Sequence, residues 1–221
     1  MKHFFKSVLV YFSLCFGLLH LTWASELEKL QPSVQQELKA LSIIGGLPTP
    51  AFTWTLEKQR TSKGKRKLVE QFLSSANGLP VMITTEIRDS REIVKQRLSV
   101  RGLMDVDSKD TTLGLKLIDL VLPLKSGAKF SFELTRDHRT VTKQCLASER
   151  QEASSLHPLM SGLIIPITCI GSATYHGLNI KSTSELVWIE SLNLFLALSE
   201  VAETPLGIFA ESTRVLSFEF R

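Results

Sequence analysis

Two cysteines, each inside a strand-like pattern, constrain this chain more than any other feature of its sequence. Between residues 129 and 135, three apolar side chains alternate with polar ones, which is the period-two pattern of a half-buried strand. Residues 141–147 predict its hairpin partner, and the almost wholly apolar stretch 163–170 predicts a third strand. Cys145 lies in the second of these strands and Cys169 in the third. We therefore expect a disulfide that joins two strands.

The first 24 residues have the pattern of a cleavable export signal. Lys2 and Lys6 provide a basic start, and an apolar run follows over 7–21. Small residues one and three positions before the cleavage point, Ala24 and Thr22, predict cleavage after Ala24. A retained membrane anchor is the first alternative, but the apolar run is short for a span and acidic residues follow it at once. A lipoprotein attached through Cys15 is the second, and the residues before that cysteine match such a site poorly.

If the protein is exported, the two cysteines are expected to form a disulfide, because disulfides persist in oxidising compartments. Cleavage would remove Cys15 and leave Cys145 and Cys169 as the only cysteines. A bridge between them closes a loop of about 25 residues, worth roughly 3–4 kcal/mol in the chain-entropy model. The alternative is a redox pair or a metal-thiolate site, but no C-x-x-C occurs and no histidine or acid recurs at ligand spacing. We predict a structural disulfide and a periplasmic or secreted protein.

The charge balance points away from nucleic acid. The full chain carries 26 basic and 22 acidic residues, and the predicted signal holds two of the basic ones, so the net charge falls from +4 to +2. This charge is too small to imply nucleic acid or anionic lipid as a partner. No second stretch approaches membrane-spanning length, so we expect a protein that is soluble after cleavage. The oligomeric state stays open.

An amphipathic helix is predicted over residues 25–44, and most firmly over 32–42. Apolar residues form one stripe at helical spacing: Leu27, Leu30, Val34, Leu38 and Leu41. Two glycines end the helix and residues 47–50 form a Pro-rich linker. The stripe is expected to cover the chain's own sheet, with docking to a partner or a membrane as the alternative. The predicted organisation is a signal peptide over 1–24, the helix and linker over 25–50, and a β-rich domain over 51–221.

Strand patterns fill most of the remaining chain. Residues 52–60 and 66–73 predict a hairpin with a basic tip, which is either solvated or a contact for phosphate or lipopolysaccharide. Further strands are predicted over 81–87, 91–101, 178–189, 192–199 and 208–221, with a loop over 172–177. In the first two of these, we expect the apolar sides to carry Val81, Ile83 and Ile87, and Val94, Leu98 and Val100.

One segment, 112–124, fits two periods. Its leucines alternate like those of a strand but also share one helical face, and we favour a short helix or a bulged strand. The predicted fold is mainly β: an antiparallel sheet curled into a sandwich or a partly open barrel, with one N-terminal amphipathic helix.

A search for chemistry finds no catalytic signature. The predicted mature chain has three histidines, His138, His157 and His176, all in predicted turns or loops. No G-x-S-x-G elbow, no metal-binding histidine spacing and no Gly-rich phosphate loop occurs. We therefore assign no catalytic residue, no cofactor and no metal.

Two groups of acidic residues match known kinds of site only in part. Glu185 and Glu190 flank Trp188, but strand alternation turns Glu185 away from the ring, so the pair fails as a two-carboxylate site. Asp105, Asp107 and Asp110 depart from the calcium-loop pattern at the glycine and at the last ligand. Trp54 and Trp188 are expected in the core or on a sheet face.

The residues alone thus favour a non-enzymatic exported protein of the cell envelope that binds a lipid-like or apolar ligand, since a curved sheet closed by a helix can enclose an apolar cavity. A solid core fits the same apolar content, and the apolar content by itself favours the core over a cavity. An accessory subunit of an envelope complex, docking through a sheet edge or the leucine stripe, is the alternative. A hydrolase built from distant loops around His157 or His176 is the second.

Overall fold

Alternating apolar and polar residues form strands along almost the whole chain. The computed structural model describes residues 27–42, 47–76, 78–88, 91–110, 113–136, 139–175 and 178–221. The helical elements are α2 (Pro32–Ser42) and the short 3-10 helix η1 (Ala153–Ser155). The strands are β1 (Phe52–Arg60), β2 (Gly64–Phe72), β3 (Val81–Arg88), β4 (Arg91–Val100), β5 (Met104–Val106), β6 (Leu113–Ile118), β7 (Lys129–Arg136), β8 (Arg139–Ala147), β9 (Gln151–Glu152), β10 (Leu163–Tyr175), β11 (Leu178–Ile189), β12 (Leu194–Thr204) and β13 (Gly207–Phe220).

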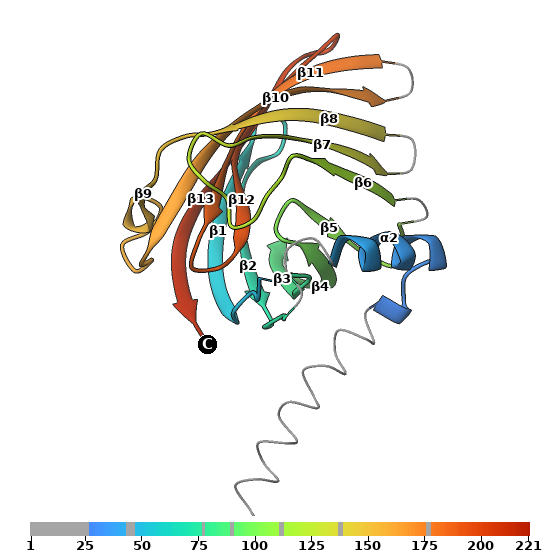
Figure 1. Ribbon diagram of the computed structural model, residues 1–221. Coiled ribbons are helices and arrows are strands. Elements are labelled where there is room, and N and C mark those ends of the chain that lie inside the picture. The colour runs from blue at the N-terminus through green and yellow to red at the C-terminus, as the bar shows by residue number, and fades with distance from the viewer. Residues whose placement is uncertain are drawn as a thin grey trace, which may run out of the picture.

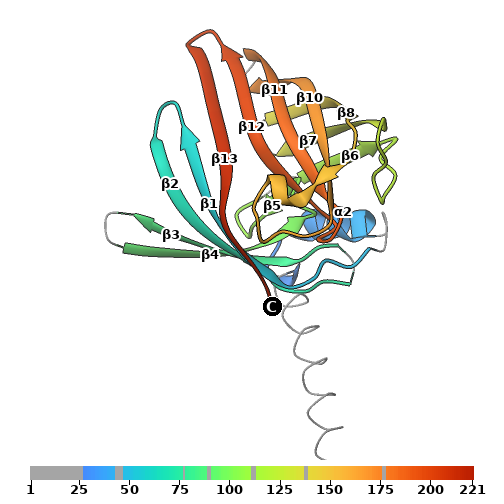
Figure 2. The ribbon, with the colours of Figure 1, turned by 90° about the vertical axis from the view of Figure 1, so that its left-hand side faces the viewer.

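All the strands belong to one antiparallel sheet. Its order is β5-β4-β3-β2-β1-β13-β12-β11-β10-β8-β7-β6, and β9 pairs with β10. The first long strand, β1, therefore lies beside the last, while β5 and β6, consecutive in the chain, form the two edges. Figures 1 and 2 show the sheet curving around an interior, with α2 beside β5 and β6. The sheet is not closed into a barrel, which confirms the predicted mainly β class in its open form.

Apolar side chains form two clusters on this curved sheet. The larger lies under α2 and includes Leu38, Leu98, Phe130, Trp188 and Phe195. The second includes Phe52, Trp54, Phe72, Ile164 and Phe218. Trp188 and Trp54 are 0% and 2% exposed, so both tryptophans are core residues.

The leucine stripe of the helix is used inside the molecule. Leu27, Leu30, Val34 and Leu38 are all at most 6% exposed and belong to the larger cluster. The observed bounds of α2 match the segment that the sequence predicted most firmly. Leu41 carries no described side chain. The stripe thus covers the chain's own sheet, as expected, and this leaves little of it to dock a partner.

Charged side chains connect the two edges of the sheet. Arg97 of β4 approaches Asp105 and Asp107, with nitrogen–oxygen distances of 3.5 and 3.8 Å. Arg136 of β7 donates to the carbonyl of Asp105 and lies 3.2 Å from an oxygen of Asp110. The aspartates that the sequence grouped together therefore face arginines, and they join the β5 edge to β7.

Burial governs the ionisation of one of these aspartates. Asp105 keeps about a third of its side chain exposed, but charged groups from β1, β2, β4 and β7 surround its carboxyl. Burial first, and the neighbouring Glu70 second, raise the pKa of Asp105 from 3.8 to about 6, although Lys58, Arg97 and Arg136 oppose the shift.

Two details of the predicted fold were wrong, and the structure decides between two alternatives for a third segment. The expected loop over 172–177 is strand as far as Tyr175, because β10 pairs without a break with both β8 and β11. For the segment 112–124, where a short helix or a bulged strand was predicted, the strand is the correct alternative: it runs over Leu113–Ile118 without a bulge, because β7 supplies a partner for each of its residues. Ile87 and Val94, expected on buried sides, are 75% and 57% exposed because they lie near the far end of the β3–β4 hairpin.

Some predictions fall outside the described residues. These are the signal peptide over 1–24 with its cleavage after Ala24, the glycines that end the helix, His138 and His176. They stay predictions.

Candidate functional site

A lysine on the apolar side of β8 is the most unusual charged residue of the sheet. Strand alternation places Lys143 on the same face as Val141, Cys145 and Ala147, all of them buried. Only 7% of the Lys143 side chain is exposed. A buried ammonium is costly unless it is paired, so its partners define the site.

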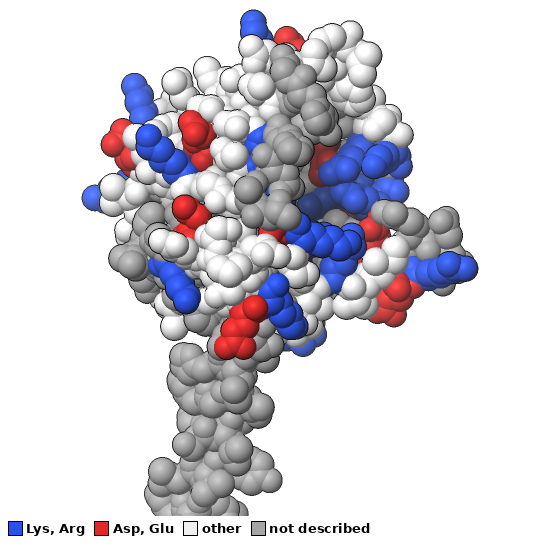
Figure 3. Space-filling view, turned by 90° about the vertical axis from the view of Figure 1, so that its right-hand side faces the viewer, with Lys and Arg blue, Asp and Glu red and all other residues white. Residues whose placement is uncertain are grey.

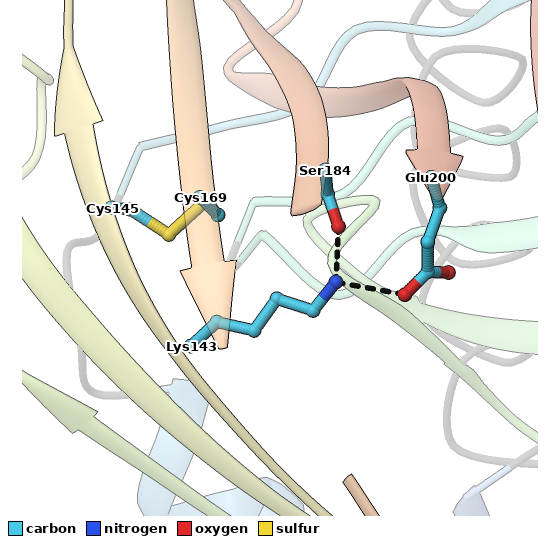
Figure 4. The surroundings of a disulfide bond; sticks show 5 residues. All are labelled: Lys143, Cys145, Cys169, Ser184 and Glu200. Atoms are coloured by element: carbon cyan, nitrogen blue, oxygen red, sulfur yellow. Dashed lines mark hydrogen bonds and ion pairs between the residues drawn. A yellow bond between two sulfur atoms is a disulfide. The ribbon is translucent and has the colours of Figure 1, made fainter. Parts of the chain in front are cut away.

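Two neighbouring strands supply these partners. The Nζ of Lys143 donates to the Oγ of Ser184 on β11 and lies 2.8 Å from Oε1 of Glu200 on β12. Figure 4 shows the lysine side chain crossing β10 to reach both. The residue opposite Lys143 on β10 is Gly171, whose lack of a side chain leaves this path open. A Cβ at position 171 would also lie 2.0 Å from the carbonyl oxygen of Thr142, so the strands approach too closely here for any larger residue.

The predicted disulfide lies two residues from the lysine on the same two strands. Cys145 and Cys169 are directly opposite each other in the register of β8 and β10, and their sulfurs are bonded. Both are almost fully buried, at 5% and 0% exposed. The bridge therefore joins β8 to β10 next to Lys143 (Figure 4).

Lys143 borders a cavity on this face. The cavity has a volume of about 230 Å³. Its apolar lining comes from β7, β8, β11, β12 and the turn before β5: Leu103, Phe132, Leu134, Val141, Leu186 and Ala197. Its polar lining consists of Arg136, Arg139, Lys143, Ser184, Ser199 and Glu200. Figure 3 shows that the side of the molecule carrying α2 is hollowed, with Lys and Arg side chains gathered beside the hollow.

The three cations of the cavity differ in how far they are neutralised. Lys143 is paired with Glu200, and Arg136 with Asp110. Arg139 is exposed and has no ion-pair partner within the described part of the chain. It also stands directly opposite Arg136 in the β7–β8 register, where two like charges repel. An anion bound here would contact Arg139 and relieve that repulsion.

The arrangement does not fit acyl transfer by a serine and a lysine. A lysine that activates a serine needs an unprotonated amine. Glu200 lies at ion-pairing distance from Nζ, and the ammonium already donates to Ser184. Lys143, Ser184 and Glu200 thus form a hydrogen-bonded group in the wall of the cavity.

The other candidate residues of the sequence analysis do not come together with Lys143 in one site. Trp188 is fully buried and offers no stacking surface, Glu185 accepts a hydrogen bond from Ser199, and Glu190 lies 2.8 Å from Arg150. His157 follows η1, where its Nδ1 accepts a hydrogen bond from the amide of Leu159 at 3.3 Å. No cluster of three or more His, Cys, Asp or Glu side chains suited to a metal ion occurs among the described residues.

Sequence reasoning did not find the Lys143 site. One signal was present: Lys143 is in phase with the buried apolar residues of its strand, whereas Thr140, Thr142 and Gln144 are out of phase. Its partners, on strands far along the chain, gave no such signal.

Comparison with known proteins adds no relative. No family model matches the chain, and neither a curated protein nor a solved structure resembles it significantly. Within the described ranges, no helix is long and apolar enough to cross a membrane.

Proposed function

We propose that this chain is an exported, non-enzymatic envelope protein that holds a single-chain anionic amphiphile in the cavity beside Lys143. The observation that carries the proposal is the lining of that cavity, which combines one apolar wall with three cations. An acyl chain would lie against Leu134, Val141 and Leu186, and its charged head would contact Arg139. Apolar residues combined with convergent polar groups are typical of small-molecule sites.

The size of the cavity limits the ligand. At about 230 Å³ it falls below the roughly 300–1,000 Å³ of common ligand pockets, which favours one short chain over a two-chain lipid. The export part of the proposal rests on the signal pattern of residues 1–24, and the Cys145–Cys169 bridge is consistent with an oxidising compartment. A periplasmic or secreted location is thus part of what we propose.

Two measurements test the ligand. Native mass spectrometry of the protein purified from its own exported compartment should show an added mass of fatty-acid size. Calorimetric titration should show that decanoate binds and that decanol, which lacks the charge, binds at least tenfold more weakly, in line with about 1.5–3 kcal/mol for a hydrogen bond to a charged group. Absence of both the added mass and the decanoate heat would overturn the proposal.

Variants locate the binding. Arg139→Ala should weaken decanoate binding about tenfold, whereas Arg150→Ala, which removes an arginine outside the cavity, should leave it unchanged. Ala197→Phe should block the cavity, while Leu146→Phe on the opposite face of β8 should not. Equal effects within either pair would place the ligand elsewhere.

An accessory subunit of an envelope complex is the second candidate, favoured by the outer face of the sheet. There, Leu146, Ile170 and Val201 are 48%, 59% and 40% exposed, and a hollow of about 530 Å³ lies between β8 and β12. Exposed apolar patches often mark protein contacts. Cross-linking in the native envelope should give one dominant product that Ile170→Asp abolishes; a product that survives this change would exclude the patch.

A further inference from the structure

The hairpin formed by β12 and β13 projects beyond its neighbour β1. The pairing of β1 with β13 ends at Arg60 and Glu211, while β12 and β13 continue together as far as Thr204 and Gly207. Figure 2 shows the tips of the β12–β13 and β1–β2 hairpins pointing to the same side, with the β12–β13 tip extending further. We call residues 204–210 the apolar tip.

Large apolar side chains crowd this tip. Leu206 is 88% exposed, Ile208 66% and Phe209 41%. The turn is held by its own hydrogen bonds, from the Leu206 amide to Oγ1 of Thr204 and from that hydroxyl to the Gly207 carbonyl. Single exposed apolar residues are common, but here three lie within four residues, and because Ile208 and Phe209 point to opposite faces of β13 the projection is apolar on both faces.

The neighbouring hairpin tip is strongly basic. The turn between β1 and β2 contacts the apolar tip directly, because the Thr61 amide donates to the Ala210 carbonyl at 3.0 Å and the Ala210 amide donates to Oγ1 of Thr61 at 3.0 Å. Residues 57–70 contain six basic and two acidic side chains, a net charge of +4. The basic ones are Lys58, Arg60, Lys63, Lys65, Arg66 and Lys67.

Part of this charge is free to meet an external anion. Arg60 pairs with Glu211, Lys65 lies 3.4 Å from Glu57, and Lys58 lies 3.9 Å from Glu70. Lys63 and Lys67 are exposed and have no ion-pair partner in the described ranges. Residues 204–210 contain no acidic side chain. Of the two acids that flank the tip, Glu203 is directly opposite Lys181 in the strand register and Glu211 pairs with Arg60. The small net charge of the whole chain therefore conceals a local basic patch.

We propose that these two tips dock the protein on the surface of an anionic phospholipid bilayer. Leu206, Ile208 and Phe209 would enter the boundary between headgroups and acyl chains, and Lys63 and Lys67 would contact the headgroup phosphates. Peripheral binding of this kind combines buried apolar area with attraction to anionic lipid, which is the pairing that the two tips present. The inference goes beyond the proposed function and does not require that the cavity hold a ligand.

Vesicle flotation tests the docking. The chain that begins at Ser25 contains every described residue and avoids the predicted signal. It should float with vesicles of phosphatidylcholine containing phosphatidylglycerol, and binding to pure phosphatidylcholine should be at least tenfold weaker. Leu206→Ser should reduce binding roughly tenfold, whereas Leu159→Ser, at a 70% exposed leucine away from both tips, should not. The double change Lys63→Glu and Lys67→Glu should reduce it more than tenfold, and Lys125→Glu should have little effect.

A spectroscopic readout separates insertion from loss of folding. Trp54 and Trp188 are buried, so a tryptophan placed by Leu206→Trp would be the exposed reporter in this chain. Its emission should shift to the blue with anionic vesicles and be quenched by brominated acyl chains, while Leu159→Trp should show neither. Absence of flotation, equal binding to both vesicle types, or equal losses from Leu206→Ser and Leu159→Ser would each overturn the proposal. Normal vesicle docking without decanoate binding would refute only the cavity ligand.

Discussion

Replacing the two members of the Lys143–Glu200 pair one at a time should give unequal losses of stability. Lys143 has only 7% of its side chain exposed, whereas Glu200 has 45%. Glu200→Gln leaves an almost fully buried ammonium with Ser184 as its remaining acceptor. Removing one partner of a fully buried pair costs about 3–5 kcal/mol, and the half-exposed carboxylate reduces this to about 1–3 kcal/mol here.

The reciprocal change removes the charge that was costly to bury. In Lys143→Met, Glu200 can be hydrated where it stands, and Ser184 loses one donor, at a cost of about 1 kcal/mol. The new apolar side chain offsets this loss because it lies among the lining residues of the cavity. We expect a net change within about 1 kcal/mol. The double variant should resemble Lys143→Met, so the coupling free energy should equal most of the Glu200→Gln loss.

Urea unfolding at neutral pH, followed by the fluorescence of the buried Trp54 and Trp188, measures the free energy of unfolding of the original chain, of the two single variants and of the double variant. The reasoning is refuted if Lys143→Met costs as much as Glu200→Gln, since the desolvation cost would then not reside on the lysine. Unchanged slopes with urea concentration would confirm that only the folded state is affected.

Four further outcomes follow from the fold. Replacing Cys145 and Cys169 together by serine should cost about 3.5 kcal/mol, from the 24-residue separation, and calorimetry showing under 1 kcal/mol would refute a structural bridge. Leu38→Ala should lower the free energy of unfolding, measured with urea, by about 2–5 kcal/mol, because that side chain of α2 is fully buried against the sheet. Gly171→Ala should cost about 1–3 kcal/mol, because its new methyl group meets the backbone of β8; a neutral result would mean that the strands can separate. Asp105→Asn tests the pKa of about 6. An acid whose pKa is raised in the folded state stabilises the fold while it is protonated, and this contribution is lost as the pH rises from 3.8 to about 6. The free energy of unfolding of the original chain, relative to that of the variant, should therefore fall by about 1–2 kcal/mol over this pH range, after allowance for solvent screening. A pH-independent difference would refute it.

Periodicity explains how much of the fold could be predicted. The helix bounds, the β1–β2 hairpin and the strands that carry Cys145 and Cys169 each follow from apolar residues at one clear spacing. The second half of β10 has no such spacing, because Gly171, Ser172 and Thr174 bury little apolar surface. Those residues are strand because neighbours on both sides supply hydrogen bonds, which a local pattern does not encode.

The candidate site depended on information that lies far along the chain. The contact between Lys143 and Glu200 spans two intervening strands, and a register shift between Glu185 and Leu186 decides which residues of β12 face inward. A one-residue change of register turns a side chain to the other face. The sequence therefore indicated that Lys143 lies on the apolar face of its strand, whereas its contacts with Ser184 and Glu200 depend on the pairing of the strands.

The pairing of β1 with β13 sets the order in which a newly made chain can complete this fold. Phe52, the first residue of β1, lies opposite Phe220, the last residue of β13. Until β13 has been synthesised, β1 has only β2 as a neighbour in the sheet, and the β1–β5 and β6–β12 segments are not joined by hydrogen bonds between strands. Pairings between such distant segments form slowly, since a long loop must close first. The sheet therefore stays in two separate parts until β13 pairs with both β1 and β12.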